Sequence, residues 1–355
     1  MIKILHSADW HLDSPLVFRN AEQARYLREA LSQIPGKIAA LCKEEHCDLM
    51  LLAGDLFDGN ANTATLQKLK RALADVGVPI FITPGNHDYL GMDSVWTTGD
   101  WPENVHIFTR PTLESVVLPD LDLRIYGSGF TAMDCPGLLA DFTAQATEQY
   151  QIAVLHGDPT QANSPYCPIS KQQVQNSGLD YLALGHIHKS DSFRAGKTLC
   201  AWPGCPMGRG YDEEGEKGVL IVTLDDTVET KFLPLDTPRF FDLEIPAGDD
   251  AAKALDSVLP AAGNRNFYRI TFTGHSNALD TDSLLRPEFP NLLLRDRTVP
   301  PVDVWGSAGQ DTFEGRYFKL LQDKLADADE DMQRRIYLAA EISRRILDGQ
   351  EVVLP

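Results

Sequence analysis

The chain has 355 residues, of which 43% are hydrophobic, and a formal net charge of −19 from 32 basic and 51 acidic residues. This size and apolar content predict a globular protein with one large and one smaller domain, and they exclude a disordered or fibrous chain. No stretch approaches the roughly 18 apolar residues of a transmembrane helix, and the start "MIKILHSADW" lacks the pattern of a signal peptide. We therefore expect a cytoplasmic protein that does not contact a membrane.

The acidic net charge and the cysteine content further limit the classes of protein to which this chain can belong. Tight autonomous binding to nucleic acid normally requires a basic surface, because neutralised phosphates supply most of the affinity. The acidic net charge argues against such binding. It is still compatible with a local basic groove, or with a partner protein that supplies the affinity for nucleic acid. Six cysteines are too sparse for a disulfide scaffold in a chain of this length, and none are spaced as CxxC zinc pairs.

The first part of the chain alternates apolar runs with helical patterns. The run "IKIL" is followed by a helical stretch from about Ala21 to Glu45, which Pro35 and Gly36 interrupt. The run in "DLMLLAGD", the helical "TATLQKLKRALADVG" and the run "VPIFIT" come next. Strands that alternate with helices in this way predict a largely parallel sheet that is covered on both faces.

After Gly91 the pattern changes, because apolar runs follow one another with few helices between them. These runs are "VHIF", "LRIYGSGF", "QIAVLHGD", "YLALGHIH", "GVLIVTL" and "VETKFLPL". Two stacked sheets flanked by helices would accommodate both halves of this region.

The rhythm shifts again near "DTPRFFDLEIP", and we predict a domain boundary at residues 236–240. A large domain would cover residues 1–237 and a small α+β domain residues 238–308. The segment 309–355 would form a C-terminal helix.

That helix would begin at Asp311 or Thr312, which can act as N-cap, and its apolar residues are spaced three and four apart on one face. The acidic run "DADED" at 327–331 would lie on the solvated face. Packing onto its own domain is the ordinary role of such a stripe, and docking onto a partner helix is the sharper alternative.

Acidic, histidine and asparagine side chains follow five of the apolar runs. In an open α/β fold, ligands bind beyond the carboxyl ends of the strands, so these five tips can converge on one spot. A single "GD" or "GH" is usually a turn, but five such tips in order are hard to produce as turns. The residues, tip by tip, are Asp9 and His11; Asp55 and Asp58; Asn86, His87 and Asp88; His156; and His186 and His188.

These side-chain types suit a pair of divalent metal ions. Carboxylate, imidazole and amide oxygen together favour manganese, iron or zinc over calcium, and one carboxylate can bridge two ions roughly 3.5–4 Å apart. Such a pair holds a hydroxide and polarises a phosphoryl oxygen, which lowers the barrier to in-line attack at phosphorus. The residues therefore indicate the hydrolysis of phosphoesters.

Two histidines outside the five tips have other expected roles. His6 shares a strand face with Ile4 and Ala8, and we expect it to be packed in the core. His275 occupies the turn in "TGHSN", where a contact with DNA is open.

The five tips read "DWH", "GDLFD", "GNHD", "LHGD" and "GHIH" over residues 9–188. This arrangement resembles the calcineurin-like metallophosphoesterase superfamily, whose pattern is DxH, GDxxD, GNH with an acid, a single H and GHxH. The fourth tip departs from the usual GH, because its glycine follows the histidine. The resemblance implies an α/β fold with a four-layer α-β-β-α sandwich, joined here to a small C-terminal α+β capping region and a terminal helix.

The resemblance also implies a ligand set. One ion would be held by Asp9, His11, Asp55 and His188. Asp55 would bridge to the second ion, which would also be held by Asn86, His156 and His186.

Three further residues would act beside the metals. His87 would stabilise the phosphorane or protonate the leaving oxygen. Asp88 would orient His87, and Asp58 would support His87 or the metal ligands. Gly85 would permit the tight turn before them.

The opening "HSADWHLDSPL" and the loop "WPGCPMGRGYDEEGEKGVLIVTL" look like the SbcD family of bacterial DNA repair exonucleases. They resemble in particular its shorter YhaO-type members, which share "ADxHLDSP". The likeness covers about residues 1–225. It implies a nuclease domain followed by a capping domain that directs DNA toward the metals, and a terminal helix that contacts an SbcC-like SMC-type coiled-coil ATPase.

We therefore predict a dinuclear-metal phosphodiesterase that acts on DNA as a repair exonuclease or endonuclease. A metal-held hydroxide would attack phosphorus with the help of His87. Manganese is the expected metal, with iron, zinc and magnesium as alternatives, and the expected partners are DNA, the SbcC-like ATPase and a second copy of the chain. Two alternatives stay open: a phosphodiesterase or phosphatase for nucleotides or small phosphoesters, and a subunit that recruits an ATPase.

Overall fold

The computed structural model describes residues 1–355 except 19, 60, 146, 277, 351 and 353–355. No helix among the described residues is both long and apolar enough to cross a membrane. Contacts divide the chain into two compact units: Met1–Asp242, Asn264–Arg269 and Phe289–Asn291 form the first, and Leu243–Gly263, Ile270–Glu288 and Leu292–Pro355 the second. The domain limits expected from the sequence stay predictions, and the segment 309–355 includes residues 351 and 353–355, which lie outside the described ones.

The first sheet of the first unit is mostly parallel. Its described strands are β1 (Ile2–Ser7), β2 (Leu49–Leu52), β3 (Ile80–Ile82), β4 (Val105–Ile107), β11 (Gly218–Leu224) and β12 (Val228–Pro234). The strand order is β12-β11-β1-β2-β3-β4. The pairs from β1 to β4 are parallel, whereas β11 and β12 add an antiparallel edge.

The second sheet repeats this design. Within the described residues its strands are β5 (Glu114–Leu118), β6 (Leu123–Gly127), β7 (Tyr150–His156), β8 (Tyr181–Gly185), β9 (Asp191–Ala195) and β10 (Thr198–Trp202), in the order β5-β6-β7-β8-β10-β9. The central strands β6, β7, β8 and β10 are parallel, and β5 and β9 are antiparallel edges. The expectations of a largely parallel sheet from the first part of the chain and of two sheets in all are confirmed.

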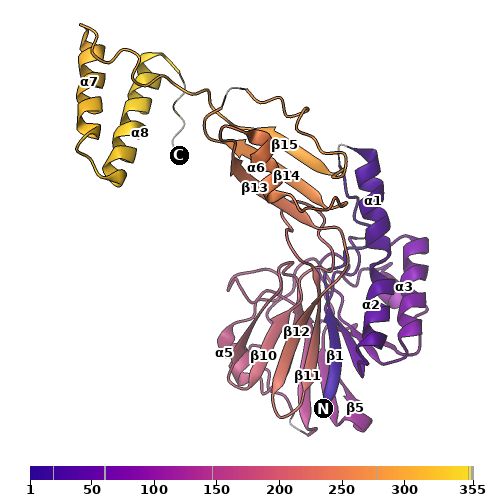
Figure 1. Ribbon diagram of the computed structural model, residues 1–355. Coiled ribbons are helices and arrows are strands. Elements are labelled where there is room, and N and C mark those ends of the chain that lie inside the picture. The colour runs from indigo at the N-terminus through magenta and orange to yellow at the C-terminus, as the bar shows by residue number, and fades with distance from the viewer. Residues whose placement is uncertain (19, 60, 146, 277, 351, 353–355) are drawn as a thin grey trace. The chain divides into compact units, whose positions relative to one another are not determined.

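Alternation along the strands places apolar side chains on both faces of each sheet. Ile4 points toward the second sheet and packs in one core cluster with Ile125 and Tyr181, while Leu5 packs on the other face with residues of the helices. A third cluster covers the outer face of the second sheet. The helices are α1 (Ala21–Ser32), α2 (Ile34–Glu44) and α3 (Thr63–Val76) over the first sheet, α5 (Lys171–Asn176) over the second, and the short α4 (Val95–Thr98) and η1 (Pro119–Leu121) (Figure 1).

The predicted four-layer α-β-β-α fold is therefore confirmed, including the break between the first two helices. Pro35 lies in the first turn of α2, where its missing N–H breaks no helical hydrogen bond. Asn20 and Asn62 cap the N-termini of α1 and α3, and Gly77 ends α3 with φ 79°.

His6 lies in the interface between the two sheets and is fully buried. Its Nε2 donates to the carbonyl oxygen of Leu184 (3.1 Å), and its Nδ1 accepts from the Tyr181 hydroxyl (2.8 Å). Both ring nitrogens are thus satisfied by a neutral imidazole. The expectation of a packed core histidine is confirmed.

The second unit contains a small α+β element. In its described part, β13 (Phe240–Pro246), β14 (Phe267–Thr273) and β15 (Leu292–Asp296) form a sheet in the order β13-β14-β15, and α6 (Ala251–Val258) lies between β13 and β14 in the chain. The first residues of β13 and β14 belong to the first unit. This composition matches the α+β region expected after the boundary.

The expected single terminal helix is wrong, because the chain forms two helices, α7 (Phe313–Leu325) and α8 (Glu330–Leu347). Thr312 is the N-cap of α7, as predicted. The acidic run is not a helix face: Asp329 accepts a hydrogen bond from the Met332 N–H (2.8 Å) and starts a new helix. Aspartate favours the N-cap over a helix interior, which is the reason for the break.

Candidate metal centre

The five predicted tips follow β1, β2, β3, β7 and β8, so the site forms where the carboxyl edges of the two stacked sheets meet. The structure brings nine of the ten predicted side chains to this place, and the tenth, that of Asp88, points into the protein beneath it. Three groups have ligand atoms that all lie within 4.8 Å of one another: Asp9 with His11 and His188, Asp9 with Asp55 and His156, and His11 with Asp58 and His87.

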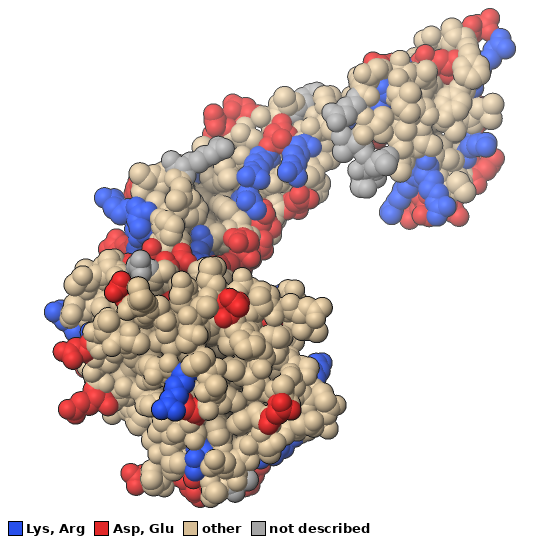
Figure 2. Space-filling model, turned by 180° about the vertical axis from the view of Figure 1, so that it is seen from behind, with Lys and Arg blue, Asp and Glu red and all other residues tan. Residues whose placement is uncertain are grey.

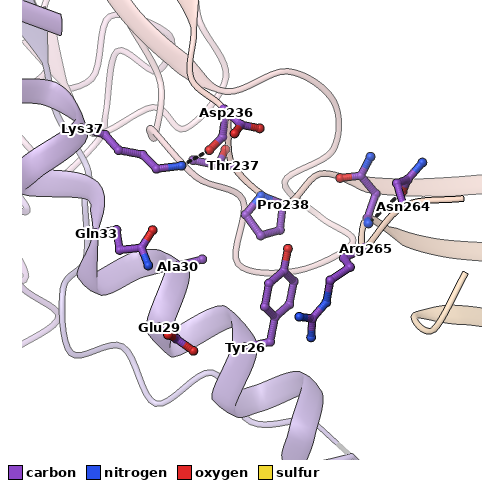
Figure 3. Close-up of a pocket in the computed structure, with 11 residues that line it drawn as sticks. Tyr26, Glu29, Ala30, Gln33, Lys37, Asp236, Thr237, Pro238, Asn264 and Arg265 are labelled. Carbon is purple, nitrogen blue, oxygen red and sulfur yellow. Dashed lines mark hydrogen bonds between the residues drawn. The ribbon is translucent and has the colours of Figure 1, made fainter. Parts of the chain in front are cut away.

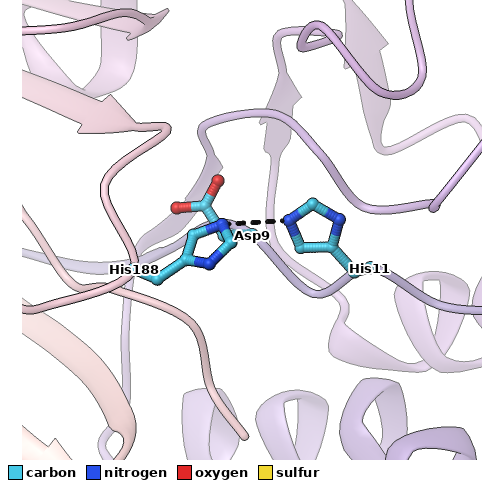
Figure 4. A group of neighbouring side chains, drawn as sticks. All are labelled: Asp9, His11 and His188. Carbon is cyan, nitrogen blue, oxygen red and sulfur yellow. Dashed lines mark hydrogen bonds between the residues drawn. The ribbon is translucent and has the colours of Figure 1, made fainter. Parts of the chain in front are cut away.

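Asp9, His11 and His188 form one half of the site (Figure 4). The Nε2 atoms of the two histidines face each other at 3.1 Å, and the Asp9 carboxylate lies beside them. Asp9 is also fixed from behind, because the backbone N–H of His186 donates to both of its oxygens (2.9 and 3.1 Å).

Asp55, Asn86, His156 and His186 form the other half. The Nε2 atom of His156 lies 2.9 Å from Asn86 Oδ1 and 3.4 Å from Asp55 Oδ2. His186 Nδ1 lies 3.2 Å from the same Asn86 oxygen. Asp55 Oδ2 is also 3.8 Å from His11 Nε2, so this carboxylate lies between the two halves, where its predicted bridging role would require it.

The backbone at these tips adopts conformations that L-residues rarely take. Asp9, His11, Asp55 and His186 have positive φ angles of 55°, 46°, 52° and 92°. Residues in this region cost of order 1–3 kcal/mol each and persist where the surrounding structure holds them. The stored strain fits a site whose ligands are positioned before any ion arrives.

Glycines let the tips approach one another closely. A Cβ on Gly85 would lie 2.2 Å from Asp55 Oδ1, and one on Gly185 would lie 2.0 Å from the carbonyl oxygen of Ala53. Gly54 has φ 89°, and a Cβ there would meet the His156 ring at 2.5 Å. Gly85 was expected to permit a tight turn; it is needed because Asp55 occupies the space of its missing side chain.

The donor set fits cations. His156 Nδ1 donates to the carbonyl oxygen of Ala53 (2.9 Å), so the Nε2 of a neutral ring carries a lone pair. That lone pair faces the oxygens of Asn86 and Asp55, and acceptors that face one another repel unless a positive charge lies between them. A proton or a divalent ion would satisfy this arrangement.

Burial and neighbouring charges together set the pKa of each titratable group in the site. Burial alone would lower the pKa of His156, but Asp55 and then Asp9 raise it to about 9, because they stabilise its protonated form. Burial would raise the pKa of Asp55, but His156 and His11 hold it well below its usual range. Burial lowers the pKa of His11 and of His186, which keeps the two rings neutral and able to act as ligands. An ion in the site would replace the proton on His156.

His87 lies at the rim, with a side chain that is 45% exposed. Its Nδ1 donates to Asp58 Oδ1 (2.9 Å), and the same carboxylate oxygen lies 3.5 Å from His11 Nδ1. Asp58 therefore supports His87 and a ligand of the first half together.

Asp88 does not orient His87, contrary to the expectation from the sequence. Its buried carboxylate accepts from the backbone N–H groups of Leu56 (2.8 Å), Phe57 (3.2 Å) and Gly85 (2.7 Å). It thereby joins the second tip to the third. Consecutive residues point in different directions, and here the backbone donors behind the site attract the Asp88 side chain inward.

Two charged residues at the site were missed by the sequence analysis. Glu213 accepts a hydrogen bond from His188 Nδ1 (2.6 Å), and Arg209 forms an ion pair with Glu213 (2.7 Å). Both lie in the loop between β10 and β11. The mixture of basic and acidic residues in this loop, after a buried strand, is the feature of the sequence that could have indicated a role at the site.

A separate pocket of about 470 Å³ lies in the first unit (Figure 3). Lys37 donates to the carbonyl oxygen of Asp236 there, and the Arg265 guanidinium lies 4.0 Å from the centre of the Tyr26 ring. None of the described lining residues belongs to the predicted site. Two basic and two acidic side chains line it, so its charge selects no ligand class.

The geometry agrees with comparisons to known proteins. The calcineurin-like phosphoesterase family matches residues 2–190, which contain all five tips. The uncharacterized metallophosphoesterase YhaO of Bacillus subtilis (strain 168) is 33% identical over an alignment of 247 residues. This alignment covers 62% of this chain. The match spans 57% of the length of that relative.

Distant similarities to solved structures also occur. A dimetal phosphatase from Danio rerio is 11% identical with a TM-score of 0.44, covering 65% of this chain and 98% of its own. An archaeal phosphodiesterase is 15% identical with a TM-score of 0.36, covering 65% and 100%. On the family match and the converged tips, the chain belongs to the calcineurin-like phosphoesterase family.

Proposed function

We propose that this protein is a phosphodiesterase that cleaves DNA, as an exonuclease or endonuclease of DNA repair in the cytoplasm, with manganese as its metal. The observation that carries the proposal is the exposed His87, paired with Asp58 beside a converged ligand set. The DNA substrate is supported by "ADWHLDSP" and the "PGCP" and "GEKG" segments, which resemble the SbcD family.

The chain's own residues divide the work. Two divalent ions, held by the predicted ligands Asp9, His11, Asp55, Asn86, His156, His186 and His188, would supply charge that polarises the phosphoryl group and activates the attacking water. Asp58 accepts from the Nδ1–H of His87 and stabilises its imidazolium form, whose Nε2–H can give a proton to the leaving oxygen.

A pocket of about 390 Å³ beside His87 supports an organic leaving group. The leaving oxygen lies next to its proton donor, so the group attached to it enters this pocket. Its described lining residues include the exposed side chains of Tyr89 and Met92 and no lysine or arginine. Such a lining suits a neutral nucleoside better than a second phosphate.

The surface charge favours a partner for DNA binding. Lys and Arg are interspersed with Asp and Glu on the face shown in Figure 2, and no continuous basic area covers that face. With a net charge of −19, long-range attraction to DNA is weak. A second protein would supply the additional affinity for DNA.

The helices α7 and α8 offer a docking surface for an SbcC-like coiled-coil ATPase, as the resemblance implied. A groove of about 680 Å³ runs between them, with Leu320 (62% exposed), Met332 (48% exposed) and Ile336 among its residues. Both apolar residues and the charged Lys324, Arg335, Asp323 and Asp327 line the groove, a mixture that fits an amphipathic helix. Other parts of the apolar stripe, such as Leu321 and Ala340, pack between the two helices.

The docking proposal is tested with Leu320→Glu, with Gln322→Glu as a control that adds the same charge to the same helix. Leu320→Glu should abolish co-purification with an SbcC-like ATPase, and the control should not. Unchanged association of both variants would remove the groove from the proposal. Light scattering of the chain by itself measures the homodimer that the sequence also allowed.

The function is tested by the degradation of end-labelled linear duplex DNA with manganese, comparing wild type with His87→Ala. His46→Ala, a change at an exposed histidine of the turn after α2, serves as the control. We expect a loss of about 10²–10⁴-fold for His87→Ala on DNA. A p-nitrophenyl diester should lose much less, because nitrophenolate leaves without a proton.

The outcomes separate substrate from chemistry. DNA loss in wild type and in His46→Ala, but not in His87→Ala, supports the nuclease. Turnover of the small ester with DNA left intact, also with the ATPase present, would contradict the nuclease and favour nucleotides or small phosphoesters. Absence of hydrolysis and of bound divalent ions would contradict both.

A further inference from the structure

The loop between β10 and β11 contacts His188, one of the predicted metal ligands. The side-chain contact is short: Nδ1 of His188 donates to Glu213 Oε1 at 2.6 Å. Glu213 is 8% exposed, and a buried carboxylate normally remains only where it has partners. The contact joins residues 25 positions apart in the chain.

The same loop also holds the backbone of His188. The N–H of Cys205 (3.3 Å) and Nζ of the buried Lys217 (3.2 Å) both donate to the carbonyl oxygen of His188. Gly204, with φ 74°, approaches so closely that a Cβ would lie 2.6 Å from that oxygen. Main chain and side chain of His188 are therefore fixed from one segment.

Arg209 keeps Glu213 in its charged form. Its Nη2 donates to Oε1 (2.7 Å), and its Nε (3.3 Å) and backbone N–H (2.8 Å) donate to Oε2. The positive guanidinium beside Glu213 stabilises its carboxylate form, and this carboxylate accepts from His188.

We propose that Glu213 is a positioning residue that fixes His188 as the Nδ1–H tautomer and strengthens it as a ligand, while Arg209 keeps Glu213 charged. The inference rests on the metal site of the proposed function. Because Nδ1 carries the proton, the lone pair lies on Nε2, which faces His11 and Asp9. A carboxylate behind a histidine raises the basicity of the ring and commonly changes metal affinity by 10–100-fold.

A competing arrangement uses the same residues. Ligand atoms of His188, Cys205 and Glu213 also lie within 4.8 Å of one another and could hold an ion of their own. Arg209 argues against this, because its guanidinium already occupies Glu213 and would repel a cation there. Burial raises the pKa of the Cys205 thiol, so it would also resist the deprotonation that a metal requires.

The test is calorimetric titration of the metal-free full chain with manganese, comparing wild type, Glu213→Gln and Glu214→Gln. The control makes the same chemical change at the adjacent exposed residue. We expect Glu213→Gln to weaken one binding event by 10–100-fold and to leave the other, and Glu214→Gln to change neither. Nitrogen NMR of the metal-free protein should show His188 as the Nδ1–H tautomer in wild type and as a mixture in Glu213→Gln.

The remaining outcomes are decisive. Equal affinities and an unchanged His188 tautomer in folded Glu213→Gln would overturn the inference. Loss of an ion in Cys205→Ser would assign the competing site and overturn it also. If wild type itself binds no divalent ion, the proposed function fails first, and the NMR result for the tautomer still reports on Glu213. At saturating manganese, Glu213→Gln should regain most of its maximal rate while needing more metal to reach half of it.

Discussion

Gly85 lies where a side chain cannot fit, because Asp55 fills the adjacent space. Gly85→Ala should therefore destabilise the protein by about 1–3 kcal/mol and displace Asp55 from its ligand position. Gly36→Ala is the matched control: Gly36 is exposed in α2, a Cβ there meets nothing within 4 Å, and alanine should stabilise a helix by up to about 1 kcal/mol. Thermal unfolding and metal content by elemental analysis measure both effects. Equal stability and metal content of Gly85→Ala and wild type would contradict the close-packing argument.

At the residue scale, the sequence predicted where the metal-type side chains gather but not how each one turns. The gathering follows from strand ends, which apolar runs locate in the chain. The partner of His87 depends on side-chain direction, so Asp58 supports His87, as one of its two expected roles, whereas Asp88 turns inward and does not. Glu213 was missed because its contact with His188 joins two loops that local patterns cannot pair.

At the element scale, the segment after β3 shapes the entrance to the site. Its position is fixed by Leu90, whose N–H donates to the carbonyl oxygen of Phe130 (2.8 Å), and by Trp96, whose indole N–H donates to the carbonyl oxygen of Asp88 (2.6 Å). Between these anchors, Tyr89 (39% exposed) and Met92 (97% exposed) line the pocket beside His87. The segment thus presents an aromatic ring where the leaving group is proposed to lie.

Stacking of a base on Tyr89 predicts that the enzyme prefers a substrate whose leaving nucleoside carries a base. Two dinucleotides measure this preference: one has a base on the leaving nucleoside, and the other lacks it. Wild type should hydrolyse the one with the base about tenfold faster in kcat/KM, which corresponds to about 1.4 kcal/mol of stacking. Tyr89→Ala should hydrolyse both at the same reduced rate, and Tyr337→Ala, at an exposed tyrosine of α8, should behave as wild type. A base preference that survives in Tyr89→Ala would exclude the stacking role.

Elements were predicted well where one period ran without interruption, and poorly at the C-terminus. The strands of the first sheet, the strands β6, β7 and β8 of the second and the break before α2 follow from apolar runs and Pro35, whereas β5, β9 and β10 were not predicted. The hairpin of α7 and α8 was predicted as one helix, because the spacing of apolar residues continues through the break at 326–329. Capping by Asp329 decides the break, and a run of several acids does not show which one will cap.

At the scale of the whole molecule, the two sheets of the first unit are linked by a histidine that never meets solvent. Burial lowers the pKa of His6 to about 3 from 6.5, although its bond to Leu184 opposes the shift. Below pH 6.5 the unfolded chain therefore binds a proton at this position and the folded chain does not. The stability that neutral His6 contributes is complete above 6.5 and is lost as pH falls toward 3.

The expected size of this effect is about 1.4 kcal/mol per pH unit, or about 2 kcal/mol between pH 6.5 and pH 5. Urea unfolding measures this effect when wild type and His6→Gln are compared at both pH values, with a chelator present to exclude metal effects. The quantity to compare is the loss of unfolding free energy between pH 6.5 and pH 5 in each protein. His6→Gln removes the titrating group, so its stability should fall less on acidification than that of wild type, whatever its stability at neutral pH. Equal losses in the two proteins would mean that His6 takes up its proton in the folded state, and that the interface between the two sheets admits a charge. Since Tyr181 and Leu184 satisfy both ring nitrogens of the neutral form, we expect the interface to exclude it.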